Sequence, residues 1–183
     1  MAIGPIATAH AKPPRSSGPA VAAGLARGAV LCLAAAAALS PAPAAAADKA
    51  RLTNLTDVAF GMVGNLGADA VRAESVCLYS TSSTNGYHVT ATGTGAGGAF
   101  ELSSGTSALA FDVSWNSAPA QSSGTLLTPN VPLTGQFSTA TQQTCNSGPA
   151  TTASLIIILR SGALSSAMAG DYSGTLTLVV APE

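Results

Sequence analysis

The sequence predicts an all-β protein, an antiparallel sandwich of two sheets, and three observations support this fold class. Apolar and polar residues alternate with a period of two in several short runs, as they do in half-buried strands. Turn-forming residues separate the runs at a spacing of roughly 8–12 residues. Each sheet built this way has one apolar face, so a second sheet is needed to cover it.

Three runs show the alternation, and a fourth is apolar throughout. Residues 87–92 and 109–116 place aromatic and aliphatic side chains at every second position. Residues 172–180 do the same, with Tyr, Leu and Val against Ser and Thr. Residues 155–159 are apolar on both faces, which predicts a central strand that is covered on both sides.

The segments between these runs predict turns, one loop and one short helix. Residues 93–98 have the letters of a dinucleotide-binding motif, but that motif needs a helix directly after it. Residues 99–102 have the pattern of a strand instead, so we expect a hairpin turn at 93–98. Residues 141–152 form the most loop-like stretch, and residues 163–169 are the single helical candidate.

Charged residues make up only 8% of the chain, against about 25% in an average soluble protein. Residues 1–47 contain three basic residues and no acidic one, whereas the remainder contains eight acidic and four basic residues. The chain therefore has no basic patch with which to neutralise phosphates, and we exclude nucleic-acid binding.

The first 47 residues have the pattern of a secretory signal peptide. A basic, proline-rich stretch ends at Arg27, the apolar run 28–39 follows, and residues 40–47 contain only small residues and proline. The apolar run has twelve residues, fewer than the roughly 20 that cross a bilayer. We therefore predict an exported protein, cleaved at or near Ala47, with no transmembrane segment after cleavage and a single domain over residues 48–183.

Two cysteines, Cys77 and Cys145, remain after this cleavage. An even pair in an exported chain indicates a disulfide, and the alternative is two buried free thiols. The third cysteine, Cys32, follows Leu31 inside the apolar run, where a lipid-modified signal would need a small residue. We expect no lipid anchor there.

The residues offer little for catalysis or metal binding. Residues 48–183 contain one histidine, His88, which lies on the Thr-rich face of its run and is expected to be exposed. Metal sites of the usual imidazole or thiolate type need three or four ligands, and a serine triad needs a histidine base. Glu101, Asp112 and Asp171 offer paired carboxylates, but few aromatic residues accompany them. We predict no enzymatic activity, no catalytic residue, no metal and no cofactor.

Four segments together resemble the spore coat protein U domain family, which includes subunits of archaic chaperone–usher pili. They are residues 58–61 (Val-Ala-Phe-Gly), 75–79 (Ser-Val-Cys-Leu-Tyr), 86–91 (Gly-Tyr-His-Val-Thr-Ala) and 169–178 (Ala-Gly-Asp-Tyr-Ser-Gly-Thr-Leu-Thr-Leu). The resemblance covers most of residues 50–183.

The resemblance implies an immunoglobulin-like sandwich that lacks its last strand. In that family a periplasmic chaperone lends a strand, and the amino-terminal extension of the next subunit then replaces it. The implied partners are a periplasmic pilus chaperone, an outer-membrane usher and other pilus subunits, and the implied location is the periplasm in transit and then the cell surface, or the medium. The partner-strand groove would be lined by Gly170, Tyr172, Leu176, Leu178 and Val180.

The apolar series Leu52, Leu55, Val58 and Phe60 is expected to be an amino-terminal donor strand or the first strand of the domain. Only four residues, 48–51, precede it, so the arm is short for a donor. Two functions stay open. The first is a non-enzymatic structural or assembly subunit of a surface pilus or fibre, which accepts a strand. The alternative is a self-contained exported binding module or adhesin.

Overall fold

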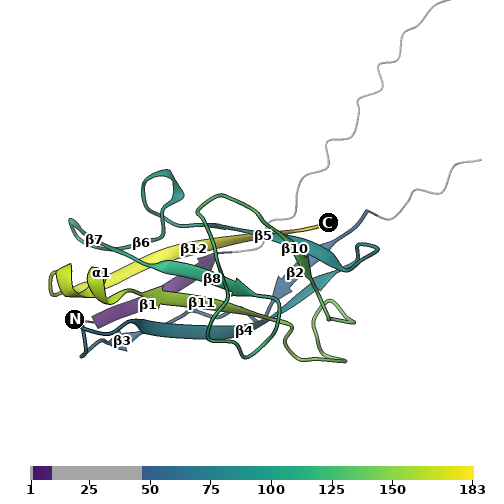
Figure 1. Ribbon diagram of the computed structural model, residues 1–183, viewed down its shortest axis with the longest axis horizontal. Coiled ribbons are helices and arrows are strands. Elements are labelled where there is room, and N and C mark those ends of the chain that lie inside the picture. Colours follow the sequence, from purple (N-terminus) through teal and green to yellow (C-terminus); the bar gives the residue numbers. More distant parts are fainter. Residues whose placement is uncertain (1, 10–46) are drawn as a thin grey trace, which may run out of the picture. The chain divides into compact units, whose positions relative to one another are not determined.

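The computed structural model describes residues 2–9 and 47–183, and these residues form an all-β fold (Figure 1). In chain order the elements are β1 Ala2–Ala9, β2 Ala50–Thr53, β3 Gly61–Met62, β4 Ala70–Ser80, β5 Gly86–Thr92, the 3-10 turn η1 Ala96–Gly98, β6 Glu101–Ser104, β7 Ser107–Ala110, β8 Asp112–Asn116, β9 Thr125–Leu126, β10 Leu133–Phe137, β11 Ala153–Leu159, α1 Ser161–Ser166 and β12 Asp171–Pro182. The predicted all-β class is confirmed.

The predicted signal peptide lies mostly outside the described residues. Residues 10–46, which include Cys32 and the apolar run, are not described, so the leader and its cleavage stay predictions. Residues 2–9 of that leader form the strand β1, which the sequence did not predict.

Five strands form one sheet in the order β2-β4-β11-β8-β9. Its central strand is β11, which pairs antiparallel with β4 along its whole length and with β8 on its other edge. The segment after β8 crosses the outer face of β11, since the backbone N–H of Gln121 donates to Ser154 Oγ (3.0 Å). Ser154 Oγ in turn donates to the carbonyl of Ala118 (2.9 Å). Residues 118–121 thus cover the face of β11 that points away from the core, so both apolar faces of this strand are shielded from water.

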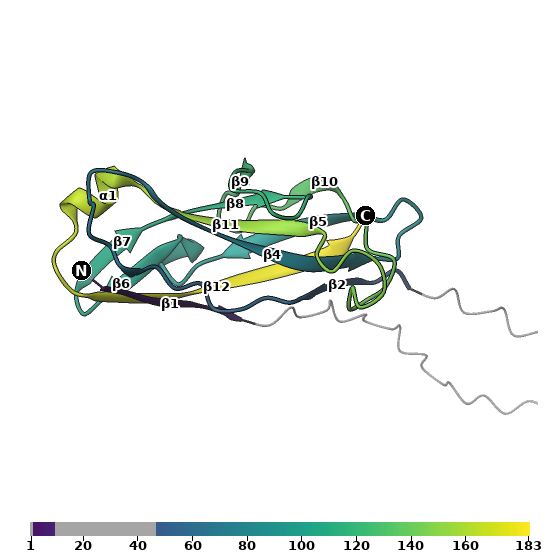
Figure 2. The same ribbon diagram turned by 90° about the horizontal axis from the view of Figure 1, so that it is seen from below.

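The other sheet has seven strands and includes the final strand, β12. Its path runs β10-β5-β12-β1-β3, while β6 also pairs with β12 and β7 pairs with β6. These pairings are antiparallel except for the parallel pair of β1 and β12. Figure 2 shows β1 running beside β12, with β4 and β11 in the facing layer.

Side chains from both sheets meet in one apolar core, which is consistent with the predicted sandwich. Trp115 of β8 and Tyr87 of β5 are at most 1% exposed, and Trp115 Nε1 donates to Tyr87 Oη at 3.0 Å. Burial raises the pKa of the Tyr87 hydroxyl to about 12, because the phenolate would lose its hydration. One buried polar contact therefore joins the two sheets.

Two expectations about local structure are wrong. Residues 109–116 are not one strand: the run divides at Phe111 into β7 and β8, which belong to different sheets. The alternation continues across the break because both strands face the same core. Residues 93–98 do not join a hairpin, since β5 and β6 both pair with β12 rather than with each other. The hairpin connects β6 and β7, with Gly105 in its turn at a φ of 57°.

The helix and the loop lie close to their predicted places. Helix α1 begins at Ser161, two residues before the predicted start, and buries Leu164. No helix or strand is assigned between residues 138 and 152, in agreement with the loop predicted there.

Candidate functional site

The candidate site is the edge of β12 that faces β1. Along β12 the side chains of Tyr172, Leu176, Leu178 and Val180 are buried and belong to the core. One edge of the strand pairs with β5 over residues 177–182 and with β6 at Ser173. This edge of β12 is therefore paired by strands that come from residues 86–104 of the same domain.

The opposite edge of β12 is completed by the far amino-terminal segment. Strand β1 pairs parallel with β12, with a register from Ala2↔Asp171 to Ala9↔Thr177. The register shifts between Ile3 and Ile6, around Pro5, which has no N–H to donate. On its other side β1 pairs antiparallel with β3. Strand β1 therefore lies in a slot between β12 and β3.

This slot can hold a strand from another source. Without β1, residues 171–177 would have no backbone partner on this edge, and β3 would lose its only strand partner among the described residues. A strand edge with unpaired N–H and C=O groups is a template on which another strand can pair. The chemistry of the slot is therefore β-strand addition, in which the backbone supplies the hydrogen bonds.

Gly170 and Gly174 shape the slot region from the other side. A Cβ at Gly174 would lie 2.8 Å from the carbonyl oxygen of Glu101, so glycine lets β6 approach β12 closely. Gly170, one of the predicted groove residues, stands just before β12, where a Cβ would meet Ser104 Oγ at 2.6 Å. The sequence analysis attached no role to Gly174, because close approach of two backbones leaves no periodic signal.

The predicted amino-terminal series is part of the domain. Leu52 lies in β2, opposite Leu78 of β4, and both Val58 and Phe60 are buried in the core. The Arg72 guanidinium stacks over the Phe60 ring at 5.5 Å. Leu55 packs against the same core. Leu52 therefore lies in β2 and the other three residues pack in or against the core, while β1, which the sequence did not predict, occupies the slot.

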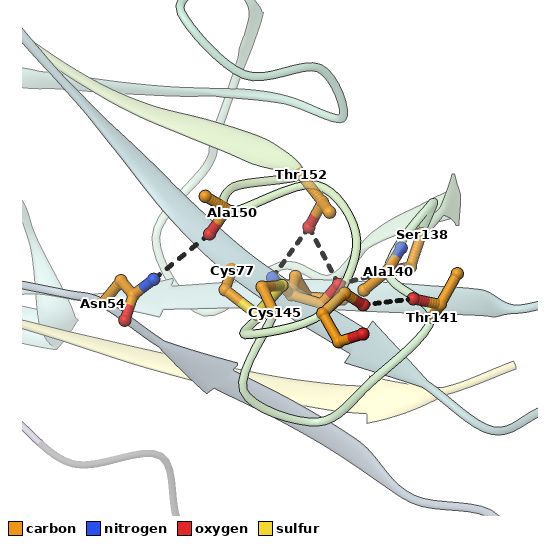
Figure 3. Close-up of a disulfide and its surroundings, with 10 residues drawn as sticks. Asn54, Cys77, Ser138, Ala140, Thr141, Cys145, Ala150 and Thr152 are labelled. Carbon is orange, nitrogen blue, oxygen red and sulfur yellow. Dashed lines mark hydrogen bonds between the residues drawn. A yellow bond between two sulfur atoms is a disulfide. The ribbon is translucent and has the colours of Figure 1, made fainter.

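The predicted disulfide is confirmed. Cys77 of β4 and Cys145 of the loop before β11 are joined, with their Cα atoms 5.9 Å apart (Figure 3). Beside the bridge, Thr152 Oγ1 accepts from the backbone N–H of Leu78 and donates to the carbonyl of Leu78, both at 2.9 Å. Asn54 Nδ2 also donates to the carbonyl of Ala150 at 3.2 Å. The bridge and these bonds hold the loop against the five-stranded sheet.

The other candidate residues have structural contacts. His88 is half-buried rather than fully exposed, and its Nδ1 lies 3.4 Å from Glu183 Oε1. Asp112 accepts from Arg160 Nε at 2.6 Å. Arg160 also donates to Asp69, whose pKa is lowered by the backbone N–H of Ser161 and by Arg160. Among the described residues, no three His, Cys, Asp or Glu side chains are grouped as a metal site would require.

Comparison with known proteins adds no assignment. No protein-family model and no curated protein matches the chain. In the part of the chain that the structure describes, no helix is long and apolar enough to cross a membrane.

Proposed function

We propose that this protein is a non-enzymatic, exported structural subunit of a surface pilus or fibre, completed by a strand from a partner. The observation that carries the proposal is the insertion of β1 between β12 and β3. The implied partners are a periplasmic chaperone, an outer-membrane usher and neighbouring subunits of the fibre.

The strand in the slot comes from the part of the chain that is expected to be removed. Residues 2–9 belong to the leader that the sequence predicts to be removed on export. Removal leaves the edge of residues 171–177 that faces β1 unpaired, beside the buried side chains of Tyr172 and Leu176. An exported chain with such an edge is prone to aggregate unless another chain pairs with it. A pilus subunit receives that strand first from its chaperone and then from the next subunit.

The register also describes the strand that the slot accepts. Strand β1 has eight residues, runs parallel to β12, and is bounded on its far side by β3. Strand β12 also contacts β2, which belongs to the facing sheet. We infer that a donor of about this length, in the parallel direction, fits the slot.

The alternative function, a self-contained exported binding module or adhesin, is also supported by one observation. The strand in the slot belongs to the same chain, so a protein that retained residues 2–9 would need no partner. Mass spectrometry of the exported protein decides between the two functions. A chain that begins near Asp48 has an open slot and supports the fibre subunit, whereas a chain that still begins at Met1 or Ala2 has a filled slot and supports the self-contained module.

The direct test compares the full chain, the chain 48–183, and the chain 48–183 mixed with a peptide of residues 1–13. We expect the shortened chain to self-associate, and the peptide to make it monomeric and protect the amides of residues 171–177 from hydrogen exchange. A peptide with Ala7→Pro and Ala9→Pro is the matched control, because proline has no N–H to pair. A monodisperse, cooperatively unfolding chain 48–183 without any partner would contradict the proposal.

A second test uses a periplasmic chaperone co-expressed with the chain 48–183. Leu178→Asp puts a charge beside the slot and should abolish the complex, with circular dichroism as the folding control. Met62→Pro is a milder variant, since Met62 is 84% exposed and only the backbone of β3 is altered. We expect it to weaken the complex without unfolding the domain.

A further inference from the structure

A pocket of about 490 Å³ opens at the end of the domain that carries the disulfide. Its walls are Tyr79, Ser80 and Thr81 at the end of β4, Asn85 in the turn that follows, and residues 138–141 after β10. It is separate from the slot described above, because β1 pairs with residues 171–177 and with β3.

The walls of this pocket are tied together by backbone contacts. The N–H of Ser138 donates to the carbonyl of Asn85 at 3.0 Å, and Ser138 Oγ donates to the carbonyl of Leu78. Thr141 Oγ1 donates to the carbonyl of Ser147 at 2.8 Å, inside the loop that the disulfide anchors (Figure 3). These bonds hold the segments that carry the walls together without a ligand, which lowers the entropic cost of binding.

Three polar side chains on these walls have no internal partner. Within the described residues, Tyr79 Oη, the Asn85 side-chain amide and Thr139 Oγ1 make no hydrogen bond to protein atoms, and Asn85 and Thr139 are exposed to solvent. Neighbouring Ser80, Ser138 and Thr141 do bond to protein atoms. The backbone of Asn85 has a φ of 55°, a left-handed conformation that asparagine tolerates better than most residues. The free groups comprise hydroxyls, which both donate and accept, and an amide, which does both at separate atoms.

The pocket also combines an aromatic ring with a lack of charge. The Tyr79 side chain packs against the cluster of Cys77, Ala140 and Cys145, and Tyr79 also lines the pocket. None of the lining residues is Asp, Glu, Lys or Arg. A charged ligand would find no opposite charge there, whereas a ligand with hydroxyl groups and an apolar face would match both the ring and the free polar atoms.

We propose that this pocket binds a neutral saccharide. Tyr79 would contact the apolar face of a sugar ring, and Asn85 and Thr139 would exchange hydrogen bonds with its hydroxyls. The proposal holds for either function above, since a fibre subunit and a self-contained module can both present this end of the domain to a glycosylated surface. We expect weak binding of a single sugar unit, with a Kd of about 1 mM.

The test titrates the full chain, with the Cys77–Cys145 bridge formed, with the methyl glycosides of glucose, galactose, mannose and N-acetylglucosamine. We expect at least one of them to give saturation-transfer signals and to shift the backbone amides of Tyr79, Asn85 and Thr139. Asn85→Gly keeps the left-handed backbone but removes the amide, and Tyr79→Ala removes the ring. Each should weaken binding about tenfold or more.

Gln142→Ala is the matched control, because Gln142 is an exposed polar residue of the same loop that does not line the pocket. It should leave the affinity unchanged. The proposal is overturned if none of the four sugars shifts these amides, if Gln142→Ala weakens binding as much as Asn85→Gly, or if N-acetylneuraminic acid, which is anionic, binds more tightly than every neutral sugar. None of these readouts depends on the slot, so failure here and failure of strand addition are distinguishable.

Discussion

Strands β11 and β12 are both central strands with buried side chains, yet they obtain their neighbours in different ways. β11 pairs on both edges with β4 and β8, which come from residues 70–116. β12 pairs with β5 and β6 on one edge, but over residues 171–177 its other edge pairs with β1. Two central strands that pack into one core can therefore differ in whether the folded domain keeps all their backbone partners.

The disulfide strengthens this contrast. Cys77 lies on β4, the neighbour of β11, and Cys145 lies in the loop that leads into β11. A covalent bond thus joins β4 to the loop before β11 in one sheet. In the other sheet, one edge of β12 is paired only by β1, a strand that the sequence predicts to be removed on export. The difference suggests a rigid half and an exchangeable half within one sandwich.

Opening the disulfide is the largest expected perturbation of the rigid half. The bridge spans a sequence separation of 68, and replacing both Cys77 and Cys145 by Ala should lower the free energy of unfolding by about 4 kcal/mol. Urea unfolding at neutral pH measures this loss, and reduction of the unsubstituted protein should reproduce it. A loss below about 1 kcal/mol would remove the contrast, because the bridge would then not be what secures this half.

Paired core truncations sharpen the comparison directly. Ile157 of β11 and Leu176 of β12 are both 0% exposed, so Ile157→Ala and Leu176→Ala should each cost about 3 kcal/mol in the full chain. The two substitutions should differ in their effect on the affinity of the chain 48–183 for the peptide of residues 1–13, which a titration measures. Leu176→Ala is expected to lower the affinity for the peptide, whereas Ile157→Ala should change it little. Equal losses of affinity would show that the two halves are not independent.

The Tyr87–Trp115 contact tests how the halves are joined. The pKa of Tyr87 is raised to about 12 from 10, so the unfolded chain releases this proton at a lower pH than the folded chain. The contribution to stability is fully present below pH 10 and is lost as the pH rises towards about 12. The loss amounts to about 2 kcal/mol. Urea unfolding of the protein and of Tyr87→Phe at pH 8 and pH 11.5 measures it, and the variant should lack this alkaline step.

The smallest effect is expected at the end of the domain that carries α1. The pKa of Asp69 is lowered by the N–H of Ser161 and by Arg160, so its carboxylate stabilises the fold above its unfolded pKa of 3.8. Asp69→Asn should lower the Tm slightly at pH 6, and this difference should shrink as the pH falls through 3.8. Asp57→Asn is the control, because Asp57 is exposed and makes no hydrogen bond or ion pair within the described residues. A constant difference across this range would contradict an electrostatic cause.

The sequence by itself determined the fold class, the faces of the strands and the disulfide. Alternation with a period of two shows which side chains of a strand share a face. The residues predicted in this way to be buried are all buried: Tyr87, Val89, Ala91, Tyr172, Leu176, Leu178 and Val180. The continuous apolar run at 155–159 likewise predicted the central position of β11. The disulfide followed from the two cysteines left after the predicted cleavage, since no other thiol was available to either.

The tertiary structure alone decided which strands pair and where the sheets end. Residues 109–116 alternate without interruption, yet they divide between the two sheets at Phe111, because both sheets face one core and alternation does not distinguish them. The pairing of β1 with β12, and the pocket beside Tyr79 and Asn85, bring together residues that are distant in the chain. Backbone hydrogen bonds carry no side-chain signature, so only the folded chain shows which segment fills the slot and which polar groups are left free.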